Sequence, residues 1–229
     1  MSRRPLDLRR QAKSFADELS ATLNGTVTDG IRLVVVMAAS GQAVIGYRLN
    51  KSDLYGADID LTLSLSPARL RLRLHHTLVL DESNRHLTTD KSTYTLVTAD
   101  NDVAVLTYDY VRDPPNKYPE AHLHIDGDAP GLQRLLSLSG RAKKRPVALH
   151  LPVGGRRYRP SLEDLIEFCI LEDLVTPRPD WQSALEASRD RFHTQQLRAA
   201  VRRKPDEAAS VLRDIGWTAS APSDSCVRT

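Results

Sequence analysis

Residues 69–76 read RLRLRLHH, and this stretch decides the fold class. Leucine occupies positions 70, 72 and 74, and arginine occupies positions 69, 71 and 73. Because side chains alternate between the two faces of a β-strand, all the leucines share one face and all the arginines share the other, together with His75. A strand that is apolar on one face and polar on the other is typical of an antiparallel sheet with one buried face.

Further strands are expected on both sides of this stretch. The candidates are short apolar or alternating segments at residues 31–37, 43–49, 59–65, 94–99, 103–111, 121–126 and 147–153. Asp100-Asn101-Asp102 and Gly154-Gly155 are typical of tight turns, so the strands should follow one another as an antiparallel meander. For residues 33–39 a buried helix fits the pattern almost as well.

Helical spacing marks both ends of the chain. Apolar residues recur every three or four positions over residues 8–23, and Asn24-Gly25 ends that run. Ser161 is positioned to cap a second helix, with Asp164 as its capping-box partner. Cys169 lies in the apolar stripe of that helix and is expected to be a small buried hydrophobe.

We therefore predict an α+β fold, with a mainly antiparallel twisted sheet, helices packed on one face and a C-terminal helical appendage. Residues 1–176 would form the sheet domain. The appendage would span residues 177–217 after the linker Thr176-Pro177-Arg178-Pro179, and residues 218–229 would be a disordered tail.

The composition agrees with one generous domain and an appended segment. The chain has 229 residues, 27% of them charged and 41% hydrophobic, with a net charge of +3. Two cysteines do not make a disulfide framework, and the N-terminus lacks the apolar stretch of a signal peptide. The most apolar region, residues 31–49, is interrupted by Arg32 and Gly41 and cannot form a membrane span. We expect a cytoplasmic protein without membrane contact.

The candidate site centres on residues 118–127, which read YPEAHLHIDG. On a strand, His122 and His124 share one face, and His150 lies opposite the leucines of its own strand. In residues 106–110, either the two tyrosines or the pair Thr107 and Asp109 must join the polar face. If these strands are neighbours, one face of the sheet collects histidines and arginines suited to phosphate chemistry.

Our first functional hypothesis is an RNA-directed protein without a cofactor. His122 and His124 would act as acid and base, with His150 in support. The basic hairpin tip would bind the nucleic acid through Arg156, Arg157 and Arg159, and Tyr158 would stack on a base. No P-loop, dinucleotide-binding or GxSxG motif is present to indicate another chemistry.

Three alternatives stay open. His122 and His124, completed by His150, Asp109 or Asp126, would form the centre of a metal-dependent hydrolase. The amphipathic, charged helices after Trp181 would instead bind a protein partner in a non-enzymatic module. The histidines would otherwise be ordinary polar residues on the solvent side of a sheet.

Short motifs between residues 103 and 172 resemble the small toxins of TumE-type toxin–antitoxin modules. They are Tyr108-Asp109, His122-x-His124, Tyr158-Arg159-Pro160 and Leu162-Glu163-Asp164-Leu165. The resemblance implies a small α+β domain that acts on or near RNA and is neutralised by a cognate protein. The long N-terminal part and the C-terminal helices depart from that family's pattern, which leaves the toxin activity open.

Overall fold

The structure is a computed structural model that describes residues 7–62, 70–115, 119–125, 151–153 and 160–221. The chain divides into two compact units, Met1–Leu185 and Glu186–Thr229. The boundary between the units falls inside a long helix, after the Pro-rich linker that marked the expected boundary at residue 176.

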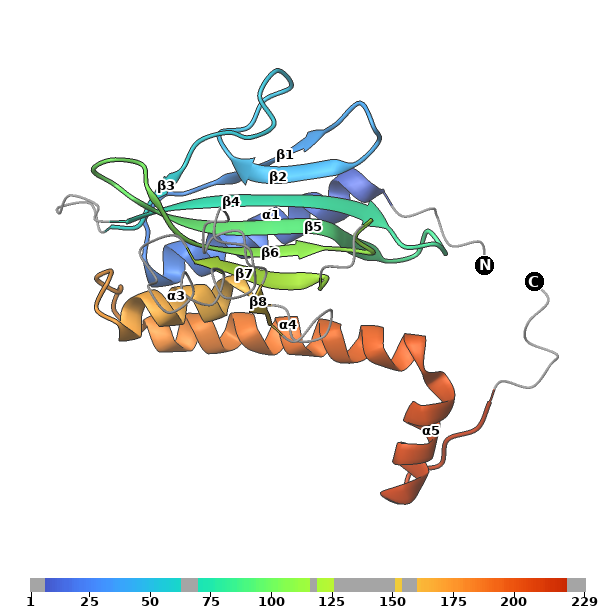
Figure 1. Ribbon diagram of the computed structural model, residues 1–229. Helices are drawn as coiled ribbons and strands as arrows, with labels where there is room; N and C mark the ends of the chain where they lie inside the picture. Colours follow the sequence, from blue (N-terminus) through green and yellow to red (C-terminus); the bar gives the residue numbers. More distant parts are fainter. Residues whose placement is uncertain (1–6, 63–69, 116–118, 126–150, 154–159, 222–229) are drawn as a thin grey trace, which may run out of the picture. The chain divides into compact units, whose positions relative to one another are not determined.

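The first unit is built on one antiparallel sheet (Figure 1). The described strands are β1 (Leu33–Met37), β2 (Ala43–Tyr47), β3 (Ile59–Asp60), β4 (Leu70–Leu80), β5 (Leu87–Thr98), β6 (Ala104–Val111), β7 (Ala121–Ile125) and β8 (Leu151–Pro152). Their order is β1-β2-β4-β5-β6-β7-β8, with β3 paired to β4. Every pairing is antiparallel, as the short turns between alternating segments predict.

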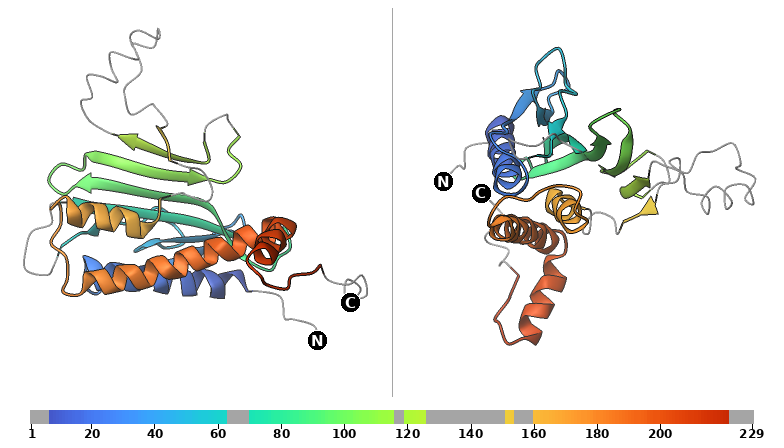
Figure 2. Two further views of the ribbon diagram at one scale, coloured as in Figure 1. Left: turned by 90° about the horizontal axis from the view of Figure 1, so that it is seen from below. Right: turned by 90° about the vertical axis from the view of Figure 1, so that its left-hand side faces the viewer.

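Helices cover one face of this sheet. In the first unit, α1 (Leu8–Thr26) and α3 (Leu162–Leu171) lie on the same side of the strands (Figure 2). Two further helices follow, α4 (Trp181–Arg203), which continues into the second unit, and α5 (Pro205–Asp214). The predicted α+β architecture is confirmed. Among the residues that the structure describes, no helix has the length and apolar character that crossing a membrane requires.

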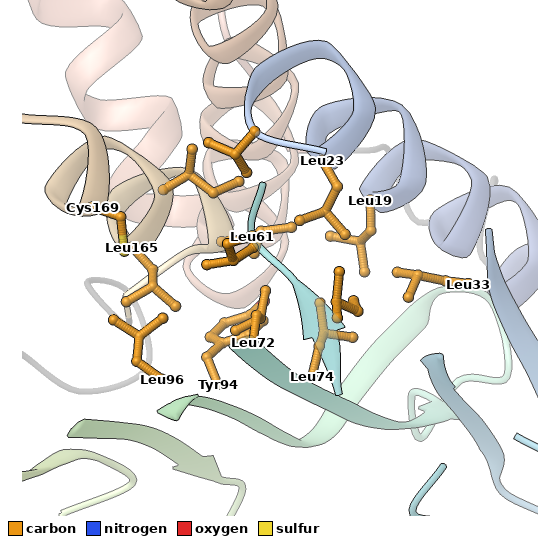
Figure 3. Close-up of a cluster of buried hydrophobic side chains, with 14 of the residues drawn as sticks. Leu19, Leu23, Leu33, Leu61, Leu72, Leu74, Tyr94, Leu96, Leu165 and Cys169 are labelled. Carbon is orange, nitrogen blue, oxygen red and sulfur yellow. The ribbon is translucent and has the colours of Figure 1, made fainter. Parts of the chain in front are cut away.

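The core lies between the helices and the apolar face of the sheet (Figure 3). Leu72 and Leu74 of β4 are buried there with Tyr94 and Leu96 of β5, while the arginines of β4 lie on the other face. Leu165 of α3 packs into the same cluster. The alternation of residues 70–74 thus sets which face of the sheet is buried, as predicted.

The two adjacent histidines of β4 fall on opposite faces. His76 is fully buried on the helix side, where its Nε2 atom lies 2.9 Å from the hydroxyl of Tyr94 and its ring meets Phe15 edge-on. His75 lies on the opposite face of the sheet with Arg71 and Arg73. The hydrogen bond with Tyr94 offsets part of the cost of burying the imidazole at position 76.

Local signals explain where the helices begin and end. Ser161 and Asp164 form the predicted capping box of α3, with their side chains bonded to each other's backbone N–H groups. The helix α1 runs to Thr26, beyond the predicted end at Gly25. A Cβ atom at Gly25 would lie 2.8 Å from the Cβ atom of Ala184, so this glycine serves close helix packing rather than helix termination.

Several element boundaries differ from the sequence-based prediction. Residues 33–37 form a strand, so the helix alternative for that segment is wrong. Strand β5 begins at Leu87, seven residues earlier than predicted. The prediction missed its first half, LTTDKST, because these residues are mostly polar and show no apolar alternation. The predicted turn Gly154-Gly155, residues 63–65 of the predicted strand 59–65 and residues 147–150 of the predicted strand 147–153 lie outside the described residues.

Candidate metal and acid–base site

The face of the sheet opposite the helices carries a polar array. Two neighbouring rows of cross-strand partners make it up, the first running through His75, Thr93, Asp109 and His122 and the second through Arg73, Thr95, Thr107 and His124. All eight side chains are polar, and each row crosses from β4 to β7 through β5 and β6. Since directly opposed residues on antiparallel strands project to the same face, this register brings the array together.

The β7 end of the array holds three metal-ligating side chains in one cluster. Asp109, His122 and His124 each offer a donor atom, and these atoms all lie within 4.8 Å of one another. Within the cluster, the Nε2 atom of His124 lies 3.8 Å from a carboxylate oxygen of Asp109. The two imidazole rings are 5.0 Å apart and nearly perpendicular. We call these three residues the His–His–Asp cluster.

Neighbouring groups hold two members of the cluster in place. The Nδ1 atom of His122 lies 3.0 Å from the backbone carbonyl oxygen of Pro119. Because a carbonyl oxygen can only accept a hydrogen bond, Nδ1 is the ring nitrogen that carries the proton and donates it. In this tautomer the Nε2 atom carries the lone pair, which can accept a proton or bind a metal ion. The hydroxyl of Thr93 donates to the other carboxylate oxygen of Asp109 over 2.6 Å.

The cluster is partly shielded from water. The His122 residue is buried, and the side chains of His124 and Asp109 are 18% and 22% exposed. Two imidazoles and one carboxylate in a partly shielded position are a ligand set of catalytic zinc and non-haem iron sites. Ligand atoms around a tetrahedral zinc ion are about 3.3 Å apart, so side-chain shifts of about 1 Å would adapt the cluster to an ion.

The β4 end of the array is organised by the loop at residues 48–58. Asp58 accepts two hydrogen bonds of 2.9 Å from the Nε and Nη2 atoms of Arg73, and Tyr55 stacks over His75 at a centroid distance of 6.3 Å. Burial lowers the pKa of His75, and the positive charge of Lys91 lowers it further, against a hydrogen bond to the backbone of Leu54. The loop thus compensates the Arg73 charge, while burial and the charge of Lys91 outweigh the Leu54 hydrogen bond and favour a neutral His75.

The structure brings together part of the predicted site. His122 and His124 share one face as expected, and of the two alternatives on β6 it is Thr107 and Asp109 that join them. His150 and the predicted nucleic-acid-binding residues Arg156, Arg157, Tyr158 and Arg159 lie outside the described residues, as does Asp126. Thr93 was missed, because the sequence-based prediction began its strand one residue later.

Two further titratable side chains on the helix side of the sheet have raised pKa values. Burial raises the pKa of the Cys169 thiol to about 12, so the thiolate is scarce at neutral pH. Burial also raises the pKa of Tyr108, with the charge of Asp164 adding to the effect. Cys169 belongs to the apolar core, as expected, and Tyr108 is partly buried and packs against it.

Comparisons of the chain with protein-family models, with curated proteins and with solved structures found no match.

Proposed function

We propose that the protein is a metal-dependent hydrolase and that the His–His–Asp cluster binds its divalent transition-metal ion. The observation that carries this proposal is the convergence of three donor atoms from two strands within 4.8 Å. A bound zinc-class ion would supply a nucleophile near neutral pH, because it lowers the pKa of coordinated water to about 7.

The groups around the cluster support a metal centre. Metal-binding histidines usually donate their second ring N–H to a carbonyl or carboxylate, and His122 meets the backbone carbonyl of Pro119 in this way. Metal-binding carboxylates are usually hydrogen-bonded as well, and Thr93 donates to Asp109. A sheet face that only meets solvent would need neither of these two hydrogen bonds.

The rest of the polar array favours a polar or anionic substrate. Next to the cluster, Thr107 donates a hydrogen bond of 3.0 Å to Thr95, and the same row ends at Arg73. Hydroxyl groups on rigid strands can accept or donate hydrogen bonds to a bound ligand. Phosphate esters are therefore the substrate class that we would test first.

Calorimetric titration with zinc tests the metal site. Protein freed of metal by a chelator should bind zinc stoichiometrically, and Asp109→Asn or His124→Gln should weaken binding at least about tenfold. The variant His193→Gln, an exposed histidine on α4, is the matched control and should bind as the wild type does. Absence of stoichiometric binding of zinc, manganese or iron(II) would rule out a metal-dependent activity at this site.

A second candidate function is metal-independent cleavage of RNA at the same cluster. It is favoured by the closeness of the two imidazoles, with ring centroids 5.0 Å apart, since a pair of histidines can supply the acid and the base of phosphodiester cleavage. Asp109 would then position His124 rather than bind a metal ion. RNA is the substrate in this candidate, which agrees with the resemblance to TumE-type toxins, since that resemblance implies action on or near RNA and neutralisation by a cognate protein.

One assay separates the two candidates. The purified protein is incubated with RNA and with a chromogenic phosphodiester, each with and without EDTA, beside the double variant His122→Ala/His124→Ala. Activity that EDTA abolishes and zinc restores would support the metal centre. RNA cleavage that survives EDTA but is lost in the double variant would support imidazole acid–base chemistry. Cleavage retained by the double variant would contradict both.

A further inference from the structure

The second unit exposes a concentrated set of apolar side chains. Half of the large hydrophobic residues exposed in the described part of the chain lie within residues 197–217, and each is between 39% and 68% exposed. They are Leu197 and Val201 of α4, Val211 and Leu212 of α5, and Ile215 and Trp217 directly after it. We call these six residues the apolar surface. Exposed apolar side chains that are concentrated in this way mark interaction sites.

The end of α5 holds part of this surface in a defined conformation. The N–H group of Trp217 donates to the carbonyl of Leu212, and the N–H group of Gly216 donates to that of Arg213. Gly216 adopts a φ of +90°, so the helix ends in a Schellman motif. Trp217, at 68% exposure, is therefore anchored at the helix end, and exposed tryptophans are frequent hot spots of protein interfaces.

Charge is separated between the two helices of this unit. The last turns of α4 and the residue after them are basic, with Arg198, Arg202, Arg203 and Lys204. The first turn of α5 is acidic, with Asp206 and Glu207. All six side chains are exposed. The end of α4 is thus complementary in charge to the start of α5, and each set of charges also suits the dipole at the end of its own helix.

The two helices match each other in an antiparallel register. Leu197 and Val201 are four residues apart, as are Val211 and Ile215, so each pair forms one ridge on its helix. An antiparallel alignment that places Leu197 opposite Ile215 and Leu212 also brings Arg202 opposite Glu207. A single register therefore pairs both the apolar ridges and the opposite charges.

Within one chain this pairing cannot form. Only Lys204 separates the end of α4 at Arg203 from the start of α5 at Pro205. Antiparallel helices need a connection of about two to eight residues, so a single residue cannot fold α5 back along α4. In agreement, α5 contains no buried residue. Complementary helices that a short connection keeps apart can pair between two chains instead.

We propose that a second copy of the protein covers the apolar surface. The α5 helix of each copy lies antiparallel along the end of α4 in the other copy, so the same contact occurs twice around a two-fold axis. Charge complementarity and the shared four-residue spacing favour a second copy over a different protein, because one chain carries both halves of the contact.

Sedimentation velocity of the full-length protein tests this pairing. A thiol reductant in the buffer excludes intermolecular disulfides, and the loading concentration spans about 1 to about 100 µM, a range that brackets moderate affinities. The weight-average mass of the wild type should rise towards that of a dimer. Ile215→Asp should weaken association about 30-fold or more, as expected for a hot-spot residue. Leu171→Asp, at an exposed apolar position of the first unit, is the matched control and should associate as the wild type does.

A charge exchange tests the register. Arg202→Glu and Glu207→Arg should each weaken association, because each places like charges opposite one another. Their combination should restore it, and circular dichroism checks that helix content is retained. A wild type that stays monomeric throughout, including one that binds only a different protein, would overturn the proposal. So would a double variant that associates no better than the single variants.

Discussion

At the scale of single residues, Thr93 is the side chain that supports the proposed metal centre without being one of its ligands. Its hydroxyl donates to Asp109 over 2.6 Å and so orients the carboxylate towards the two imidazoles. Replacement by the isosteric valine should lower zinc affinity by about 10- to 100-fold, the usual cost of losing such a supporting contact. Calorimetric titration of zinc into the Thr93→Val variant measures this loss.

The control for this substitution lies on the same strand. Thr88 of β5 is also partly exposed and takes no part in the polar array, so Thr88→Val should leave zinc affinity unchanged. Equal losses in the two variants would show that a general change in the strand, rather than the bond to Asp109, sets the affinity.

His75 gives the stability of the protein a pH dependence. Because its burial and the charge of Lys91 lower its pKa in the folded state, the unfolded chain binds a proton more readily. Below the unfolded pKa of about 6.5, protonation of the unfolded state therefore reduces the free energy of unfolding, and the contribution is fully present only above that pH. Urea unfolding measures the free energy of unfolding at about pH 7.5 and at about pH 5.5. The difference between these two free energies should be smaller for His75→Asn than for the wild type.

The exposed His193→Asn variant controls for the removal of one imidazole. If the wild type and the His75 variant lose the same free energy of unfolding on acidification, His75 does not carry the effect.

At the scale of the elements, the start of α3 offers a direct test of local stabilisation. Ser161 accepts a hydrogen bond from the backbone N–H group of Asp164, and it is buried against the core. Ser161→Ala should lower the free energy of unfolding by about 1 kcal/mol, because the first turn then loses a capping acceptor. Ser183→Ala, at an exposed position inside α4, should change stability by at most about 0.5 kcal/mol. Urea unfolding of both variants measures the difference.

The elements differ in how far the sequence determines them. Strict alternation in residues 70–74 and the Ser161/Asp164 capping box are local signals, so the faces of β4 and the start of α3 could be predicted. The early half of β5 was missed because its residues are polar on both faces, and only the pairing with β4 and β6 makes it a strand. The cluster itself depends on strand order. The sequence placed His122 and His124 on one face, but only the register of β6 against β7 adds Asp109.

At the scale of the whole molecule, a metal ion at the His–His–Asp cluster would join two neighbouring strands, since Asp109 lies on β6 and both histidines lie on β7. An ion that binds only the folded state stabilises it by mass action, by about 2.7 kcal/mol at a free concentration of 100 times the Kd. For a chain of this size, that corresponds to a rise in Tm of roughly 5 to 10 °C. Differential scanning calorimetry across a zinc series should show this rise.

The same prediction has a local signature. Zinc should slow hydrogen exchange at the backbone amides of the β6–β7 ladder more than at those of β1 and β2, which lie at the opposite edge of the sheet. A variant that carries Asp109→Asn, His122→Ala and His124→Ala has no ligand left and should show neither the rise in Tm nor the local protection. A rise in Tm that persists in this variant would place the bound metal elsewhere in the molecule, and the cluster would then owe its geometry to the polar face of the sheet alone.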